Sequence, residues 1–218
     1  MLRQSIFFLL ISLLFTSACE RSPYHGMKEG KVIYDVEIDS EDIPALMQVM
    51  MPSEATTWFS EGRSCMVMEG AGGMMEMRMI SDPQKKIFAN LFSGMGQKMA
   101  ILSNPDSLKA KMSKKMDKVV DFTGNTKVIA GIKCEEAVIT GDSGAVFKVY
   151  YTDELDIETP NWGIGFGKIE GLMMEYDIEM RGLRLKLKAK EIVAAKPDPE
   201  LFTIPADYEI KDQSQKKQ

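Results

Sequence analysis

Apolar and polar residues alternate with a period of two from Lys31 onward, which is the repeat of a β-strand with one buried face. Val32, Tyr34, Val36 and Ile38 share the apolar face of this first strand. The same alternation returns in short runs between glycine-bearing breaks, which predicts a succession of further strands. These runs cover residues 56–60, 64–68, 74–81, 86–92, 98–102, 128–129, 135–140 and 145–151.

The last predicted hairpin has the best-defined register, because both of its faces agree on it. A two-residue turn at Arg181 and Gly182 places apolar residues opposite one another on one face and opposite charges on the other. The apolar pairs are Met180–Leu183, Ile178–Leu185, Tyr176–Leu187 and Met174–Ala189, and the charged pairs are Glu179–Arg184, Asp177–Lys186 and Glu175–Lys188. A slip of one residue would move every leucine to the polar face, so we expect this register to form.

Two segments carry apolar residues at helical spacing instead. Residues 40–52 begin with capping residues and end at Pro52, and residues 104–121 carry apolar residues on one side and lysines on the other. About ten strands with only two short helices predict a mainly antiparallel β protein. Such helices would cover only part of the sheet, so a second sheet, inward side chains or a ligand must fill the rest of its apolar side.

The N-terminus predicts export. Residues 1–18 combine a short basic start, an apolar run and small residues, which is typical of a secretory signal peptide. Cys19 follows in a sequence that resembles a bacterial lipobox, although Thr16 stands where that motif usually has Leu. Acylation of Cys19 would anchor the protein in a membrane, and ordinary secretion with an incidental cysteine is the alternative. Residues 19–30 are expected to form a tether, residues 31–210 the folded domain and residues 211–218 a frayed tail.

Charge and the rarity of reactive residues narrow the function. The formal net charge of −5 and the absence of a basic and aromatic cluster argue against a nucleic-acid partner. His25 is the only histidine and lies in the predicted tether, so Ser-His or Cys-His catalysis and His-rich zinc sites lack their residues. We expect no enzyme activity, cofactor or metal site. Cys65 and Cys134 could form a disulfide in an exported protein, a pairing that their spacing leaves open.

Methionine is the most unusual component, with 18 residues in the chain. If residues 70–73 form a four-residue hairpin loop, one face gathers Met66, Met68, Met75, Met77 and Met79. Thioethers bind Cu(I), but methionine is also an adaptable apolar residue and recurs on both predicted helices. We therefore favour an apolar surface over a copper site. Its other candidate residues are Met47 and Met50, Met112 and Met116, and Trp162 and Phe166. The last two could form an apolar lip, and ordinary packing under a long loop is the favoured alternative for them.

Several segments together resemble an uncharacterised family of bacterial lipoproteins. They are EGKVIYDVEI, NTKVIAGIKCEEAVIT, YYTDEL, IEGLMMEYDIEM and PDPELFTIPADYEI, and they span most of the chain from Gly30 to Tyr208. That family is related in fold to the Lol-type lipoprotein carriers, which are curved antiparallel half-barrels lidded by helices. The resemblance implies a half-barrel with two helices on its concave side and a hydrophobic cavity between them. It implies no activity and transfers no binding residue.

The sequence thus predicts a monomeric lipoprotein of the cell envelope, anchored at the outer membrane, that holds a lipid or another hydrophobic ligand. A structural lipoprotein with a filled interior is the second hypothesis, and a periplasmic Cu(I)-binding protein is the third. Whether the interior is filled or hollow depends on packing that the sequence does not specify.

Overall fold

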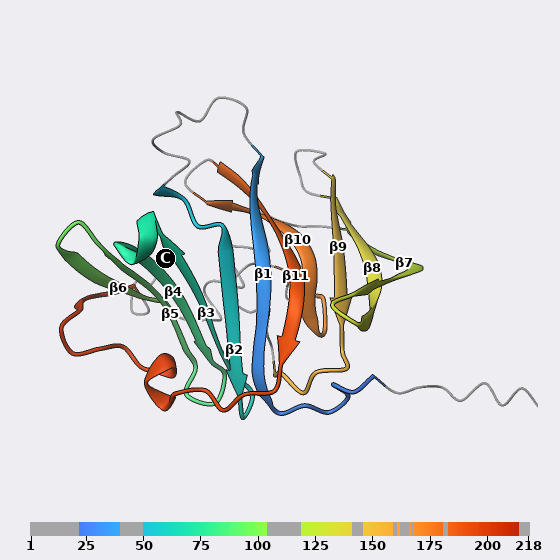
Figure 1. Ribbon diagram of the computed structural model, residues 1–218, viewed down its shortest axis with the longest axis horizontal. Coiled ribbons are helices and arrows are strands. Elements are labelled where there is room, and N and C mark those ends of the chain that lie inside the picture. The colour runs from blue at the N-terminus through green and yellow to red at the C-terminus, as the bar shows by residue number, and fades with distance from the viewer. Residues whose placement is uncertain are drawn as a thin grey trace, which may run out of the picture.

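A computed structural model describes residues 22–39, 50–103, 119–140, 146–158, 161, 166, 168–180 and 183–213. Its strands form one open sheet of 12 strands that bends into a half-barrel (Figure 1). The strands are β1 (Glu29–Asp39), β2 (Glu54–Ser60), β3 (Arg63–Gly70), β4 (Met75–Asp82), β5 (Ile87–Gly94), β6 (Gln97–Ser103), β7 (Val119–Ile129), β8 (Ile132–Thr140), β9 (Val146–Thr152), β10 (Leu172–Met180), β11 (Leu183–Val193) and β12 (Glu209–Asp212). Short 3-10 turns lie at η1 (Ala71–Gly73) and η2 (Pro199–Phe202). The predicted mainly β fold is confirmed.

The sheet order is β12-β6-β5-β4-β3-β2-β1-β11-β10-β9-β8-β7. Chain neighbours pair as antiparallel hairpins from β2 to β6 and from β7 to β11, and β1 joins the two series by pairing with both β2 and β11. The register predicted for the β10–β11 hairpin is confirmed from Glu175↔Lys188 to Met180↔Leu183. Burial explains why this register wins, since Leu185 and Leu187 are fully buried while the intervening charged residues face outward.

The predicted helices fall mostly outside the described residues. Residues 40–49 and 104–118, which carry most of both predictions, are not described. The end of the second prediction is wrong, because Val119 and Val120 begin β7, which is much longer than the predicted strand at residues 128–129. Among the described residues, no helix is long and apolar enough to span a membrane.

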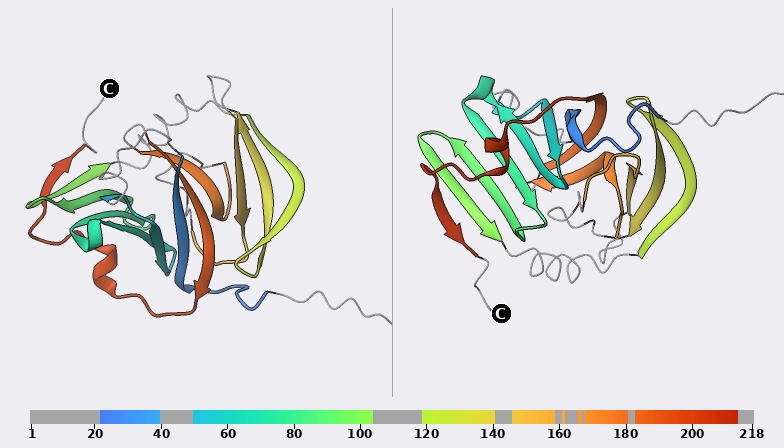
Figure 2. Two further views of the ribbon diagram at one scale, coloured as in Figure 1. Left: turned by 45° about the horizontal axis from the view of Figure 1, so that its top comes forward. Right: turned by 90° about the horizontal axis from the view of Figure 1, so that it is seen from below.

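The chain after β11 forms a strap, residues 194–208, along the outer face of the sheet (Figure 2). The strap carries η2 and leads to β12, which pairs in parallel with the edge strand β6. Phe202 and Tyr208 of the strap are buried, the Arg63 guanidinium lies 4.6 Å from the centre of the Phe202 ring, and Lys98 forms an ion pair with Asp207. The predicted tail therefore begins as ordered sheet through Asp212, and residues 214–218 lie outside the described part.

The described part of the predicted tether is docked on the domain. The Gly26 amide donates to the Glu154 carbonyl at 2.8 Å, and the Asp156 amide donates to the Met27 carbonyl at 3.0 Å. Tyr24 and Met27 also pack against the inner core. Polar composition suggested a solvated segment, but these two apolar side chains and the backbone hydrogen bonds bind it to the chain between β9 and β10.

Two buried clusters lie on opposite faces of the sheet. The inner cluster fills the concave side and contains residues from β1, β2, β3 and β8 to β11, among them Tyr34, Met68 and Leu187. The outer cluster lies between the strap and strands β3 to β6 and includes Cys65 and Phe202. Strand alternation separates the clusters within β3, because Cys65 faces outward while Met66 and Met68 face inward.

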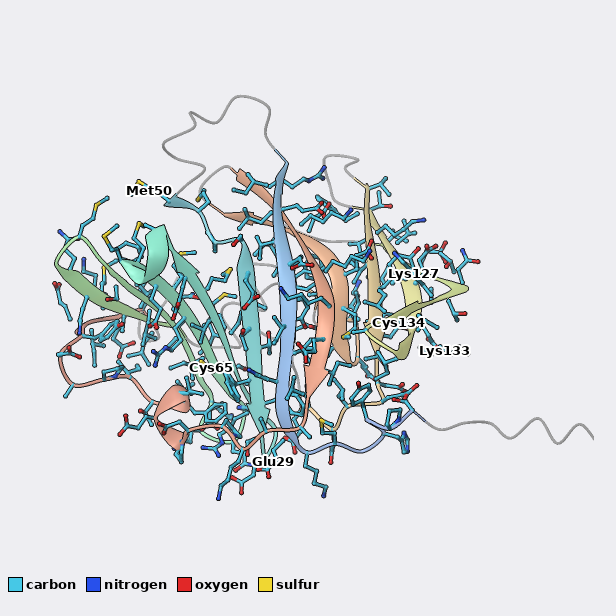
Figure 3. The ribbon with its side chains drawn as sticks, in the orientation of Figure 1. Glu29, Met50, Cys65, Lys127, Lys133 and Cys134 are labelled. Carbon is cyan, nitrogen blue, oxygen red and sulfur yellow. The ribbon has the colours of Figure 1, made fainter. Side chains whose placement is uncertain are left out.

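The disulfide left open by the sequence does not form. Cys65 and Cys134 are both free and fully buried. Cys65 belongs to the outer cluster on β3, and Cys134 belongs to the inner cluster on β8, with five strands between them in the sheet order (Figure 3). A disulfide requires Cα atoms within about 7 Å, and no local shift would bring these two strands together.

Candidate functional site on the concave face

The methionine hairpin of β3 and β4 is the starting point of the candidate site. Met68 pairs with Met77, and Met66 pairs with Met79, while Ala71 to Met74 form the connecting loop. A four-residue loop at residues 70–73 would pair Met66 with Met77, so the predicted register is wrong by two residues. Because side chains alternate with a period of two, a shift of two residues keeps every methionine on its predicted face. The gathering of these methionines on one face is therefore confirmed.

Cross-strand pairing arranges the inner face of β2 to β5 in three rows. The first row is Ala55, Met68, Met77 and Phe92; the second is Thr57, Met66, Met79 and Asn90; the third is Phe59, Ser64, Ser81 and Phe88. The first row is apolar, the second carries one hydroxyl and one amide, and the third carries two hydroxyls between phenylalanines. The face thus changes from thioether-rich to hydroxyl-rich along the strands.

A cavity of about 40 Å³ lies at the hydroxyl-rich end. It is lined by Thr57, Ser64, Met66, Met79, Ser81, Phe88, Asn161, Leu172, Met173 and Tyr176. Its lining comes from β2, β3, β4 and β5 on one side and from β10 and Asn161 on the other, which the curvature of the sheet brings face to face. A cavity of this size holds a few water molecules or the end of a larger ligand, and it is far smaller than a pocket of about 300 Å³ for a whole drug-sized molecule.

Tyrosines and Asn161 fix the wall opposite the methionine hairpin. The Tyr34 hydroxyl donates to the Met173 carbonyl at 3.0 Å, and the Tyr34 and Tyr176 rings meet edge to face at 6.1 Å. The Asn161 side-chain amide donates to the carbonyls of Ile169 at 2.9 Å and Gly171 at 2.7 Å. These contacts hold the start of β10 and its preceding loop in place.

Burial controls the protonation of this wall. It raises the pKa of both Tyr34 and Tyr176 well above the ordinary value, so both hydroxyls keep their protons at neutral pH. The nearby Thr57 hydroxyl opposes the rise in the pKa of Tyr34, but it forms no hydrogen bond of normal geometry with any described residue. The wall therefore presents neutral donors and acceptors.

Beyond the cavity, the inner face of β4 to β6 is partly exposed and mostly apolar, with the Asn90 amide among its apolar side chains. The half-buried residues on this face are Met75, Met77, Met79, Phe92, Met99 and Ile101. On β1, β10 and β11, by contrast, the inward residues Val32, Met173 and Leu187 are almost completely buried. An apolar surface that remains accessible to solvent is a candidate for ligand contact.

The remaining predicted site residues divide into three groups. Met47, Met112, Met116 and Trp162 lie outside the described residues, as does Cys19. Met50 is half-buried, and its carbonyl approaches Gly70 so closely that a Cβ there would lie 2.2 Å from it. Phe166 is 6% exposed and belongs to the inner cluster, so this residue follows the packing alternative and does not form a surface lip.

The structure also bears on the copper hypothesis. Cys65, the cysteine next to Met66, faces the opposite side of the sheet and cannot join the methionines as a ligand. Among the described residues, no group of three or more His, Cys, Asp or Glu side chains could hold a metal ion. Within the described part of the inner face of β3 and β4, the soft ligands available to copper are the methionine thioethers.

Sequence reasoning missed the hydroxyls of the cavity. Ser81 continues the alternation of Met75, Met77 and Met79 by one step, so its position on the inner face could have been read from the sequence. Thr57 and Asn161 carried no comparable signal, because their place beside Ser81 depends on the register of β2 and on the bending of the sheet.

Comparison with known proteins identifies the fold alone. No family model matches the sequence, and a search of curated proteins finds no relative. The solved structure of PNGF-II matches with a TM-score of 0.51 and 13% identity, over 86% of this chain and 31% of that chain. MucB matches with a TM-score of 0.35 and 11% identity over 85% of this chain and 60% of that one. LprF from Mycobacterium bovis matches with a TM-score of 0.30 and 9% identity, over 78% of this chain and 90% of that one.

The chain thus spans about a third of the length of PNGF-II and three fifths of the length of MucB. At this identity the match to PNGF-II supports a shared β architecture and no shared activity. The likenesses to MucB and LprF carry no argument about function. The functional conclusion must come from the site.

Proposed function

We propose that this protein is an exported, lipid-anchored envelope protein that holds the alkyl part of a hydrophobic ligand on the methionine-rich inner face of β3 to β6. One observation carries the proposal, namely the half-buried apolar row of Met77, Phe92 and Met99 on the concave side of an open sheet. Apolar side chains on the concave side of a soluble half-barrel would normally be covered. Methionine suits a surface that adapts to irregular alkyl chains.

The size of the cavity defines how such a ligand would lie. About 40 Å³ admits the end of a ligand and not its whole chain. The rest of the chain would follow the rows from Met66 and Met79 toward Met77 and Phe92, where the face is partly exposed. The proposed role is binding, and the described residues that line the cavity offer hydroxyls, an amide and apolar side chains for it.

Displacement of a fluorescent alkyl probe from the purified full-length protein tests this role. Met77→Lys places a charge in the middle of the inner face and is expected to weaken probe binding at least tenfold, because the alkyl chain would have to desolvate an ammonium group. Met74→Lys is the matched control, since Met74 lies in the same hairpin and is 74% exposed. This control should bind the probe like the unaltered protein.

Native mass spectrometry of the same preparation separates the competing functions. A co-purifying alkyl mass supports the proposal, whereas a clean protein mass together with no probe uptake would favour a structural lipoprotein with a filled interior. The Met75→Leu, Met77→Leu variant preserves apolar volume and should retain the probe. Stoichiometric copper that this variant loses would replace the proposal with a metal site.

The anchor is the second part of the proposal. Only Glu20 and Arg21 separate Cys19 from the docked segment that begins at Ser22, so acylation at Cys19 would hold the domain close to the membrane surface. Metabolic labelling with palmitate should mark the unaltered protein and not the Cys19→Ala variant. Equal absence of label from both proteins would remove the anchor from the proposal.

A further inference from the structure

The floor of the cavity contains two buried hydroxyls that are poorly satisfied. Thr57 is 4% exposed and Ser81 is 6% exposed, and neither hydroxyl oxygen forms a hydrogen bond of normal geometry with any described residue, although the Thr57 hydroxyl lies close enough to Tyr34 to lower the pKa of that tyrosine. A buried hydroxyl without a partner is unfavourable, and native proteins usually satisfy such groups with protein, water or ligand. Both residues line the same cavity, so a polar ligand group inside it could reach these hydroxyls directly or through water.

The surroundings of these hydroxyls favour an uncharged partner. Among the described residues, the cavity lining contains hydroxyls, one amide, thioethers and apolar side chains, and no Lys, Arg, His, Asp or Glu. Tyr176 remains protonated because burial raises its pKa. Asp82, the buried acid next to Ser81 in the chain, accepts a hydrogen bond from the Lys85 amide, and strand alternation places it on the other face. A carboxylate or phosphate would lose its hydration here without gaining a cation.

The apolar rows beside the cavity define the rest of the ligand. Met66 and Met79 line the cavity and also belong to the second row, which adjoins Met68 and Met77 in the first row. Hydrogen-bonding groups and an alkyl-compatible surface are therefore continuous on one face. A ligand that matches both has a small polar end and a linear apolar body.

Resting on the proposed function, we infer that the site selects neutral amphiphiles, such as long-chain alcohols or monoacylglycerols, by binding their hydroxyl end between Thr57 and Ser81 while the alkyl chain lies on the methionine rows. The two protein hydroxyls can each donate and accept, so they can satisfy a ligand hydroxyl in either sense. An alkane lacks this group, and a fatty carboxylate brings a charge that nothing in the lining neutralises.

A ligand series of one chain length tests the selectivity with the full-length protein. Displacement of the fluorescent probe is measured with a primary alcohol, the corresponding fatty acid at neutral pH, and the corresponding alkane. We expect the alcohol to bind about tenfold more tightly than either of the others, as one or two buried hydrogen bonds would give. Equal affinities across the series would overturn the inference and leave the proposed function intact, whereas failure of all three to displace the probe would count against both.

Substitutions at Thr57 and Ser81 test whether their hydroxyls cause the selectivity for the alcohol. Thr57→Val combined with Ser81→Ala should reduce alcohol affinity about tenfold and leave alkane affinity unchanged, which cancels the selectivity. Folding should survive, because each substitution replaces a buried hydroxyl by an apolar group of similar shape. Thr56→Val combined with Ser93→Ala is the matched control, since strand alternation places both residues on the outer face. Unchanged alcohol selectivity in the cavity variant would show that ordered water alone satisfies these hydroxyls.

Discussion

The two halves of the sheet use the same alternation of apolar and polar residues with different results. In the half formed by β1 and β8 to β11, the inward side chains form a continuous cluster, and Val32, Val149 and Leu187 are completely buried. In the half formed by β3 to β6, the inward methionines and Phe92 are mostly half-buried, while the buried contacts lie on the outer face beneath the strap. We call these the closed half and the open half.

The difference shows that the alternation along a strand determines which residues share a face. It does not determine which other part of the protein covers that face. In the closed half, strong curvature brings β1 and β8 to β11 around one interior, so their apolar faces cover one another. In the open half, the strap covers the opposite face with Phe202 and Tyr208 and leaves the thioether-rich face accessible. In the open half, the packing of the strap on the outer face therefore contributes most of the stability. The inner face remains accessible for ligand binding.

Truncation of one core side chain in each half should give the largest contrast. Leu187→Ala removes a fully buried side chain between β1 and β10 and is expected to lower the free energy of unfolding by about 3 kcal/mol, since a cavity would remain. Met77→Ala removes a half-buried side chain and should cost about 1 kcal/mol or less. Denaturant unfolding measures both, and equal losses would mean that the open half is as tightly packed as the closed half.

Acid should affect the edge of the closed half through Glu136, with a smaller effect than the loss of a core leucine. The Tyr150 hydroxyl donates to this carboxylate at 2.6 Å, and Asn125, Lys148 and Thr123 also donate to it, so its pKa falls from 4.5 to about 2. The lowered pKa stabilises the folded state above about pH 4.5, and this contribution is lost as the pH falls toward 2.

Glu136→Gln should flatten this acid dependence in thermal unfolding measured from neutral pH downward. Glu135→Gln is the control, because Glu135 is the exposed neighbour in β8 and accepts one hydrogen bond from the Tyr151 hydroxyl. A steep acid transition that persists unchanged in the Glu136 variant would assign it to another part of the protein.

Thiol labelling should show the smallest difference between the two halves, because it reports only on the surroundings of Cys65 and Cys134. Burial raises the pKa of both Cys65 and Cys134 to about 12, so neither should react with alkylating reagents in the folded protein at neutral pH. At low denaturant concentration we expect Cys65 to react first, because it belongs to the smaller outer cluster. The single variants Cys65→Ala and Cys134→Ala assign the modified residue by mass, and simultaneous labelling would indicate one cooperative unit.

The sequence by itself determined the strands, the register of the last hairpin and the face that carries the methionines. The β10–β11 register was readable because any slip by one residue would expose Leu185 and Leu187 and bury their charged neighbours. The methionine face tolerated an error of two residues in the loop, since that shift leaves the alternation unchanged. These features depend on residues that are close together in the chain and on the alternation of apolar and polar residues in the sequence.

Only the tertiary structure decided which segments pack against each face of the sheet. Thr57 and Ser81 lie across the interior from Met173 because the sheet bends, and neither strand pattern encodes the direction or the extent of that bend. The parallel pairing of β12 with β6 joins segments that are far apart in the chain. The four residues of β12 are all exposed, so their sequence contains no apolar pattern that would predict this pairing. Curvature and long-range pairing result from the packing of the whole sheet, so the cavity and its unpaired hydroxyls become visible only once the chain has folded.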